Sequence, residues 1–227
     1  MPSWGFIGKS FQLHRLKYFN TSLHCGAASY YITLSARVPA SGLEQLFQVK
    51  VDEECLGVLD LTCPIARPLV TESSEKVEQE PVCGFGLHKP RLPHWPSSES
   101  AFNDTARFYL VKESELRCND WISTYVELAI CTSVRSIEDR HLSLFELEIV
   151  QVAIEALEDV EPPSLDTKNA VFYIVYKDLA KARTGEPCDR KVIVRRLIDE
   201  EATGTLALKG KSGAKKKKKR QEKKIKL

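Results

Sequence analysis

The sequence predicts an α+β protein: a small antiparallel β meander, a disordered proline-rich linker, one long helix packed on an antiparallel sheet, and a disordered basic C-terminal tail. Three observations favour this fold class. Apolar and polar residues alternate before residue 63, six prolines fall within residues 64–100, and an apolar stripe with helical spacing runs from Leu142 to Val160. The 227 residues suffice for one core with long flexible segments.

The N-terminal segment has the composition of a targeting peptide. Residues 1–43 contain no Asp or Glu, and Trp4, Ile7, Phe11 and Tyr18 recur at helical spacing. Basic, hydroxyl-rich and amphipathic sequence is typical of mitochondrial transit peptides. Residues 1–28 are therefore expected to form a flexible arm or a presequence.

Residues 29–63 are expected to form the meander. Tyr30–Val38 and Phe47–Val51 alternate between apolar and polar side chains, which is typical of half-buried strands. Cys55–Leu61 is a third candidate strand. A unit this small needs further packing to be stable.

Residues 64–100 are expected to be a disordered linker, because core-forming residues are sparse between its prolines. Val82–Trp95 is more apolar. It is expected either to dock on the body or to bind another protein.

The main folded unit is expected over residues 101–208. Ala106–Val111 is a candidate strand, with a helix running on from Phe102 as the alternative. Trp121–Val134 fits a helix and a strand equally well. A preceding Asn119 or Asp120 is a good N-cap, which favours a helix.

Leu142–Val160 gives the strongest helical pattern. Its apolar stripe is opposed by an acidic face, and Pro162 and Pro163 would end the helix. This face is expected to be an ordinary exposed side of a core helix or an acidic partner-binding surface.

The strands of this unit follow. Ala170–Tyr176 is apolar and rich in β-formers, so a central strand is expected, and the turn at Ala182–Asp189 leads into a returning strand at Lys191–Ile198. A last short strand is expected at Thr205–Leu208.

Residues 209–227 form the basic tail. This segment carries eleven cations against Glu222, whereas residues 1–208 hold 22 Lys and Arg against 30 Asp and Glu. The candidate residues for nucleic-acid contact or for a localisation signal are Lys209, Lys211, Lys215, Lys216, Lys217, Lys218, Lys219, Arg220, Lys223, Lys224 and Lys226.

Such a tail suits salt-sensitive contact with RNA phosphates, and the same residues match a nuclear import signal. The sequence thus predicts a non-catalytic protein that associates with RNA or a ribonucleoprotein, in the nucleus or nucleolus. The alternative is a protein–protein adaptor or complex subunit whose partner binds at 142–160 or 82–95 and whose tail is only an address. A mitochondrial matrix location is the alternative for localisation.

No catalytic motif is found, and no cofactor is expected. Cys63, Cys83, His88 and His94 do not match a zinc spacing, so no metal is expected. Seven cysteines without a CxxC pair favour a reducing compartment. The two Gly-Lys-Ser tripeptides, at 8–10 and 210–212, lack the earlier glycine of a phosphate-binding loop. No apolar run is long enough to cross a membrane.

Overall fold

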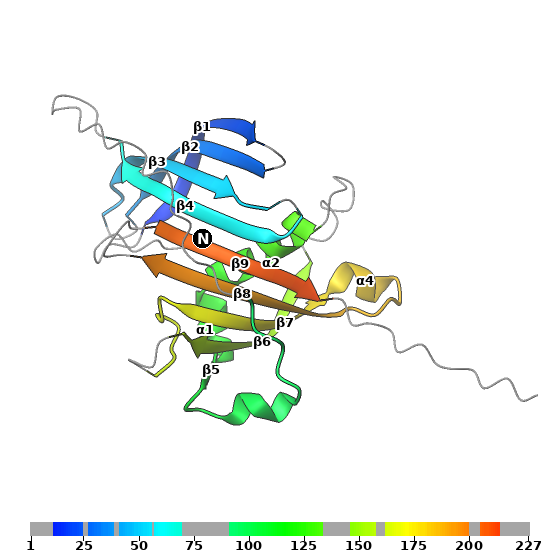
Figure 1. Cartoon of the computed structure of the whole chain (residues 1–227). Coiled ribbons are helices and arrows are strands. Elements are labelled where there is room, and N and C mark those ends of the chain that lie inside the picture. Colours follow the sequence, from blue (N-terminus) through cyan, green and yellow to red (C-terminus); the bar gives the residue numbers. More distant parts are fainter. Residues whose placement is uncertain are drawn as a thin grey trace, which may run out of the picture.

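The computed structural model describes residues 11–24, 27–38, 41–55, 57–69, 91–133, 146–157, 162–199 and 205–213. In these ranges nine strands form one antiparallel sheet in the order β1-β2-β3-β4-β9-β8-β7-β6-β5 (Figure 1). The strands are β1 (Gln12–His24), β2 (Ala27–Arg37), β3 (Glu44–Glu53), β4 (Leu59–Pro68), β5 (Phe108–Leu110), β6 (Leu147–Ala156), β7 (Ala170–Asp178), β8 (Asp189–Asp199) and β9 (Thr205–Gly213). The helices are η1 (a 3-10 helix, Glu99–Asn103), α1 (Glu113–Cys118), α2 (Trp121–Ser133) and α4 (Leu179–Arg183).

The predicted fold class is wrong, because one large sheet replaces the long helix on a sheet. The predicted helix at 142–160 is strand β6 over Leu147–Ala156. Glu146 and Leu157 flank this strand, and the rest of the predicted range lies outside the described residues. The register of β6 with β7 shifts between Ile149 and Gln151. This bulge places Ile149 and Val152, three residues apart, against the same core, which imitates helical spacing.

Other elements match the predictions better. β2, β3, β5, β7, β8 and the helix α2 lie where strands and a helix were predicted. The expected flexible arm, however, contains the thirteen-residue strand β1. β4 begins at Leu59 and continues through Pro64 to Pro68, into the predicted linker.

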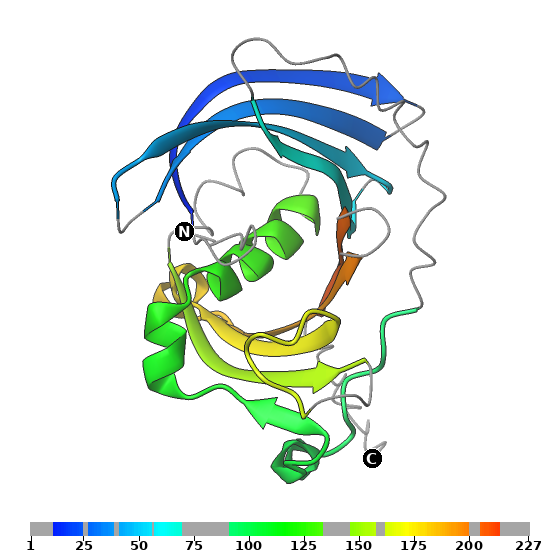
Figure 2. The same ribbon diagram turned by 90° about the vertical axis from the view of Figure 1, so that its left-hand side faces the viewer.

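The sheet curves around α2, which is the green helix inside the curve in Figure 2. α2 contacts β4, β8 and β9. Its Ile122 and Val126 are fully buried, as are Phe172 and Ile174 of β7 and Val194 of β8 on the inward face of the sheet. Burial of such side chains contributes roughly 1.5–3 kcal/mol each, so this helix–sheet contact is the main core.

Arg196 fastens the inward face of β8 to α2 and to the loop before β7. Its guanidinium carbon lies 5.1 Å from the Trp121 ring centre and 4.9 Å from that of Phe172. Its Nε donates to the Lys168 carbonyl at 3.2 Å. The guanidinium group therefore lies against two aromatic rings of the core and still donates hydrogen bonds.

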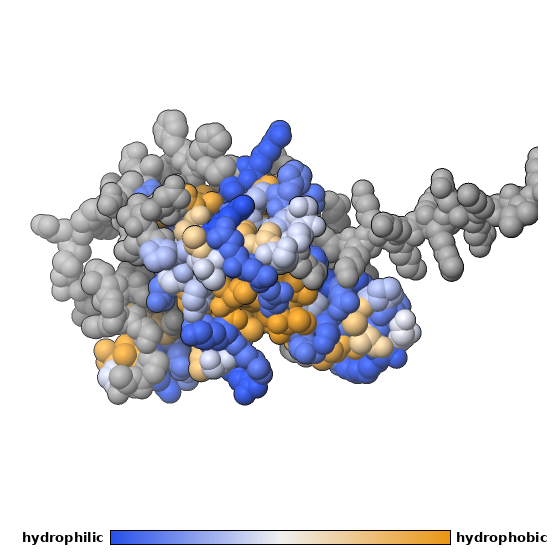
Figure 3. Space-filling view, turned by 90° about the horizontal axis from the view of Figure 1, so that it is seen from below, coloured by the Kyte–Doolittle hydropathy of each residue, from blue (hydrophilic) through white to orange (hydrophobic). Residues whose placement is uncertain are grey.

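The lower edge of the sheet is only partly covered. β5 pairs with residues 153–155 of β6, so residues 147–151 of β6 form the sheet edge beyond it. Figure 3 shows an apolar area between polar lobes at this end of the molecule. Leu110 of β5 and Val150 of β6 are exposed. The bulge at Val150 interrupts the edge that could otherwise pair with another chain.

β9 joins the two halves of the sheet. Leu59–Cys63 of β4 pairs with Leu206–Gly210, while β8 pairs with β9 along its whole length. A Cβ at Gly210 would lie 2.7 Å from Leu59 Cδ2 and 3.2 Å from the Ile193 carbonyl oxygen. Gly210 therefore allows β9 to pack closely against Leu59. The Gly-Lys-Ser tripeptide at 210–212 lies within strand β9.

We expect Gly210→Ala to lower the free energy of unfolding by about 1–3 kcal/mol, because the new methyl group overlaps Leu59. Urea unfolding measures this loss. In a Leu59→Ala background the same substitution should have a smaller effect, since the overlapping atom is gone. An unchanged stability for Gly210→Ala alone would show that β4 and β9 do not pack as described.

Candidate functional site

The basic tail begins inside the sheet. Lys209 and Lys211 belong to β9, where Lys209 pairs with Arg195 and Lys211 with Ile193 of β8. Strand alternation turns Leu206 and Leu208 towards the core and both lysines outwards. The prediction of a disordered tail is therefore wrong for Lys209–Gly213, which are part of strand β9. The predicted cations from Lys215 to Lys226 lie outside the described residues.

A group of four outward cations on β8 and β9 results. We name it the cationic face, and it consists of Lys191, Arg195, Lys209 and Lys211. They differ in accessibility, because Lys211 is exposed whereas Arg195 is only 6% exposed. Lys209 Nζ lies 3.5 Å from Asp60 Oδ2, and Lys191 Nζ lies 4.6 Å from the centre of the Trp95 ring. Lys211 is thus the most available of them for an anionic partner.

An aromatic cluster borders this face. Trp95 and Phe102 come from the segment before β5, and they pack edge-on against Phe108 and Tyr173 with ring centres 5.2–5.8 Å apart. Phe102, Phe108 and Tyr173 are buried. The structure describes residues 91–95 of the segment 82–95, and in this part Trp95 packs on the body of the protein. Because the rings pack against one another and three of them are buried, the cluster stabilises the fold and does not offer free ring faces for stacking on bases.

Glu155 is the polar centre beside this cluster. One carboxylate oxygen accepts from Arg107 Nε and the other from the Tyr173 hydroxyl, both at 2.6 Å. Burial and the bond to Glu155 raise the pKa of Tyr173, while burial lowers the pKa of Arg195 against the attraction of Tyr173 and Glu155. Both pKa shifts come from burial and from contacts that hold the fold together. The sequence analysis placed Glu155 on the exposed face of a helix, so it did not predict these contacts.

We expect Glu155→Gln to reduce the free energy of unfolding by about 1–3 kcal/mol, because it removes a charged acceptor beside the buried Arg195. Glu148→Gln on the same strand is the matched control. Its carboxylate is 3.5 Å from Lys177 and both side chains are well exposed, so the loss should be below about 0.5 kcal/mol. Equal losses in guanidinium unfolding would contradict the role given to Glu155.

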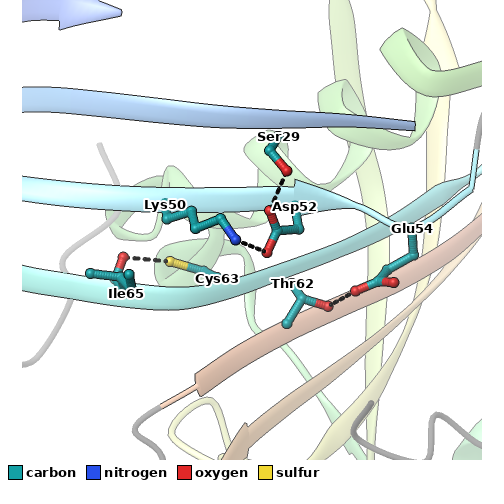
Figure 4. A network of polar contacts seen from close by, with 7 residues as sticks. All are labelled: Ser29, Lys50, Asp52, Glu54, Thr62, Cys63 and Ile65. Atoms are coloured by element: carbon teal, nitrogen blue, oxygen red, sulfur yellow. Dashed lines mark hydrogen bonds and ion pairs between the residues drawn. The ribbon is translucent and has the colours of Figure 1, made fainter. Parts of the chain in front are cut away.

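The other half of the sheet carries polar contacts across β2, β3 and β4 (Figure 4). Asp52 accepts from Ser29 Oγ at 2.6 Å and pairs with Lys50 Nζ at 3.0 Å. Cys63 donates to the Ile65 carbonyl, and burial raises the pKa of its thiol to about 11. At neutral pH this thiol is almost wholly protonated, so it is a poor nucleophile.

Of the residues considered for a metal site, the structure describes only Cys63 and His94. Cys83 and His88 lie outside the described residues, and His94 is exposed in the segment before η1. Within the described ranges, no three His, Cys, Asp or Glu side chains gather in a way that could hold a metal ion. None of the helices described combines the length and the apolar character of a membrane-spanning helix.

The fold and this face define a class of protein built on one curved antiparallel sheet, with a helix inside the curve and cations on the outward side of β8 and β9. A family model described as Protein MS5 matches residues 92–208, more than half of the chain. The chain belongs to this family, whose relatives carry the name UPF0725. The matched range contains the aromatic cluster, Glu155 and α2.

Named relatives extend the comparison. The chain is 55% identical to UPF0725 protein EMB2204 of Arabidopsis thaliana, over 89% of this chain and 60% of that protein. It is 44% identical to UPF0725 protein At1g02770 of the same plant, over 89% of this chain and 62% of that protein. The chain therefore spans about three fifths of these relatives.

A solved structure has the same fold. The crystal structure of MS5 from Brassica napus superposes with a TM-score of 0.70 at 27% identity, covering 91% of this chain and 89% of that one. At 91% of this chain, the likeness extends beyond the matched family region at residues 92–208.

Proposed function

We propose that the protein is a non-catalytic component that associates with RNA or a ribonucleoprotein through residues 209–227. One observation carries this proposal. β9 presents Lys209 and Lys211 on an outward face beside Lys191, and the chain then continues in sequence into Lys215–Lys219. Lys209 and Lys211 of the cationic face and the cations from Lys215 onward thus belong to one stretch of sequence.

Charge distribution supports contact by this stretch alone. Residues 1–208 carry a net charge of −8, so most of the body repels phosphate, whereas residues 209–227 carry +10. Lysines bind phosphates as point charges and without base-specific geometry. We therefore expect contact that follows the phosphate backbone and shows little sequence preference.

We also propose a nuclear or nucleolar location, with residues 209–227 as the import signal. In support, β1 lies in the expected presequence at residues 1–28, and β1 is hydrogen-bonded to β2 along its length. Cleavage after residue 28 would remove β1 from the sheet. This favours the nuclear location over the mitochondrial matrix.

A role as a protein–protein adaptor is the second candidate. The acidic helix that was expected to carry it is replaced by β6, and Trp95 packs within the body. A different surface supports this role, because β1 exposes Leu16, Phe19 and Leu23. Single exposed apolar residues are common, but several on one strand indicate a contact surface.

We expect deletion of residues 214–227 to weaken binding to a labelled single-stranded RNA by at least about a hundredfold at low salt, since nine of the eleven cations are lost. For the full chain, log affinity should fall linearly with log salt, with a slope of about −0.7 per phosphate neutralised. Filter binding or fluorescence anisotropy measures both.

Two variants sharpen this test. Lys211→Gln should weaken binding by a few-fold and Lys209→Gln by less, because Lys209 already pairs with Asp60. Lys112→Gln, on an exposed residue before α1, is the matched control and should leave binding unchanged. RNA affinity that survives the deletion would refute the proposal.

A further inference from the structure

Two tyrosines are exposed on the outward face of β1 and β2. Tyr18 is 74% exposed and Tyr31 is 47% exposed. Leu34 of β2 packs in an inward cluster with Phe47, and side chains alternate along a strand, so Tyr31 and Thr33 point outwards. Tyr18 is directly opposite Thr33 and therefore shares this face. Unlike the buried rings beside β5, these two rings are accessible to a partner.

The two tyrosines are neighbours across the strands. Because Tyr31 lies two residues from Thr33 along β2, Tyr18 and Tyr31 are diagonal neighbours, with their Cα atoms about 7–8 Å apart. Lys50 Nζ lies 5.8 Å from the centre of the Tyr31 ring and 3.0 Å from Asp52 Oδ2, which restrains both side chains. RNA-binding sheets stack two or three unpaired bases on exposed aromatic rings of adjacent strands. The pair has this arrangement.

Amide side chains that can bond to base edges lie beside the rings. Asn20 is directly opposite Tyr31, and Gln48 is directly opposite Thr33. Each amide carries both a donor and an acceptor, as the edges of bases do. We name this group the tyrosine face, and it consists of Arg15, Tyr18, Asn20, Tyr31, Thr33, Gln48, Lys50 and Arg67.

The charge of the tyrosine face suits RNA. Its residues include three cations and no acid, and both of its arginines are exposed. The two acids that border it each lie beside a cation, since Glu44 is directly opposite Arg37 and Asp52 pairs with Lys50 (Figure 4). A phosphate backbone can therefore approach this part of the sheet, although residues 1–208 are acidic overall.

We propose that the tyrosine face stacks unpaired bases of single-stranded RNA on Tyr18 and Tyr31. The proposal rests on the proposed function, in which residues 209–227 contact the phosphates. The tyrosine face adds contact with the bases. One strand of RNA can reach both, because β4, which carries Arg67, is paired with β9. Stacking accepts every base, so the contact keeps the low sequence preference expected of the lysines.

The test compares two fluorescein-labelled strands of equal length. One is a strand of about ten uridines, and the other carries abasic riboses in place of the uridines. Both have the same phosphates, so residues 209–227 should bind them equally. In anisotropy titrations with the full chain, the uridine strand should bind at least about tenfold tighter, because only this strand can stack on the rings. Equal affinities for the two strands would overturn the proposal.

Substitutions assign this preference to the two rings. Tyr18→Ala combined with Tyr31→Ala should lower the affinity for the uridine strand to that for the abasic strand, and should leave the latter unchanged. Tyr18→Phe combined with Tyr31→Phe keeps both rings and should keep the preference. Tyr18→Ala alone, at the more exposed ring, should reduce the preference a few-fold. A preference that survives the double alanine substitution would overturn the proposal.

Phe19→Ala is the matched control. Phe19 follows Tyr18 in β1 and is 53% exposed, but it is directly opposite Ile32 on the inward face. This variant should bind both strands like the unmodified chain, and circular dichroism should show all variants folded. A loss of the uridine preference in Phe19→Ala equal to that in Tyr18→Ala would overturn the assignment to the outward face.

Deletion of residues 214–227 tests the proposed function separately. It should weaken binding of both strands by the same factor. If affinity and the uridine preference both survive the deletion, contact through the lysines is refuted and the tyrosine face stands. If the deletion weakens binding but the full chain does not distinguish the two strands, the proposed function stands and the tyrosine face fails. Binding of a glutamate peptide that requires both tyrosines, without a uridine preference, would identify an acidic protein segment as the occupant and overturn the proposal.

Discussion

The antiparallel pairing of β9 with both β4 and β8 holds the two halves of the chain in one sheet. Without it, the strands β1–β4 would be a separate meander, and α2 would lose part of the surface on which it packs. Leu59 and Gly210 approach closely at this junction, so there is no room for a side chain at position 210 of β9. The same strand sets the outward direction of Lys209 and Lys211. Stability and the proposed function therefore depend on one strand.

Much of the sheet was predictable, because β2 alternates between apolar and polar side chains, while β7 and β8 are rich in apolar β-forming residues. The bulged strands were not. In β1 and β6 the bulges place Leu13, Leu16 and Phe19, or Ile149 and Val152, three residues apart on one face, which is a helical spacing. A sequence pattern cannot distinguish this from a helix turn. The β-branched residues of β6 were the available sign of a strand.

The candidate site was only partly predictable. The charge of residues 209–227 was evident from composition, but the strand conformation of Lys209–Gly213 depends on partners more than 140 residues earlier in β4. Gly210 and Lys211 looked like flexible tail because their local sequence lacks apolar alternation. Glu155 and Arg195 come together only through the pairing of β6, β7 and β8. Long-range pairing of this kind leaves little local signal.

The most direct test of this account is amide hydrogen exchange over residues 205–213 in the full chain. If β9 is the central strand, amides of Leu206, Leu208 and Gly210 should exchange as slowly as those of Phe172 in β7. The result should persist when residues 214–227 are removed. Exchange of 209–213 at the rate of an unfolded peptide would contradict the account, since the lysines would then belong to the tail and not to the sheet.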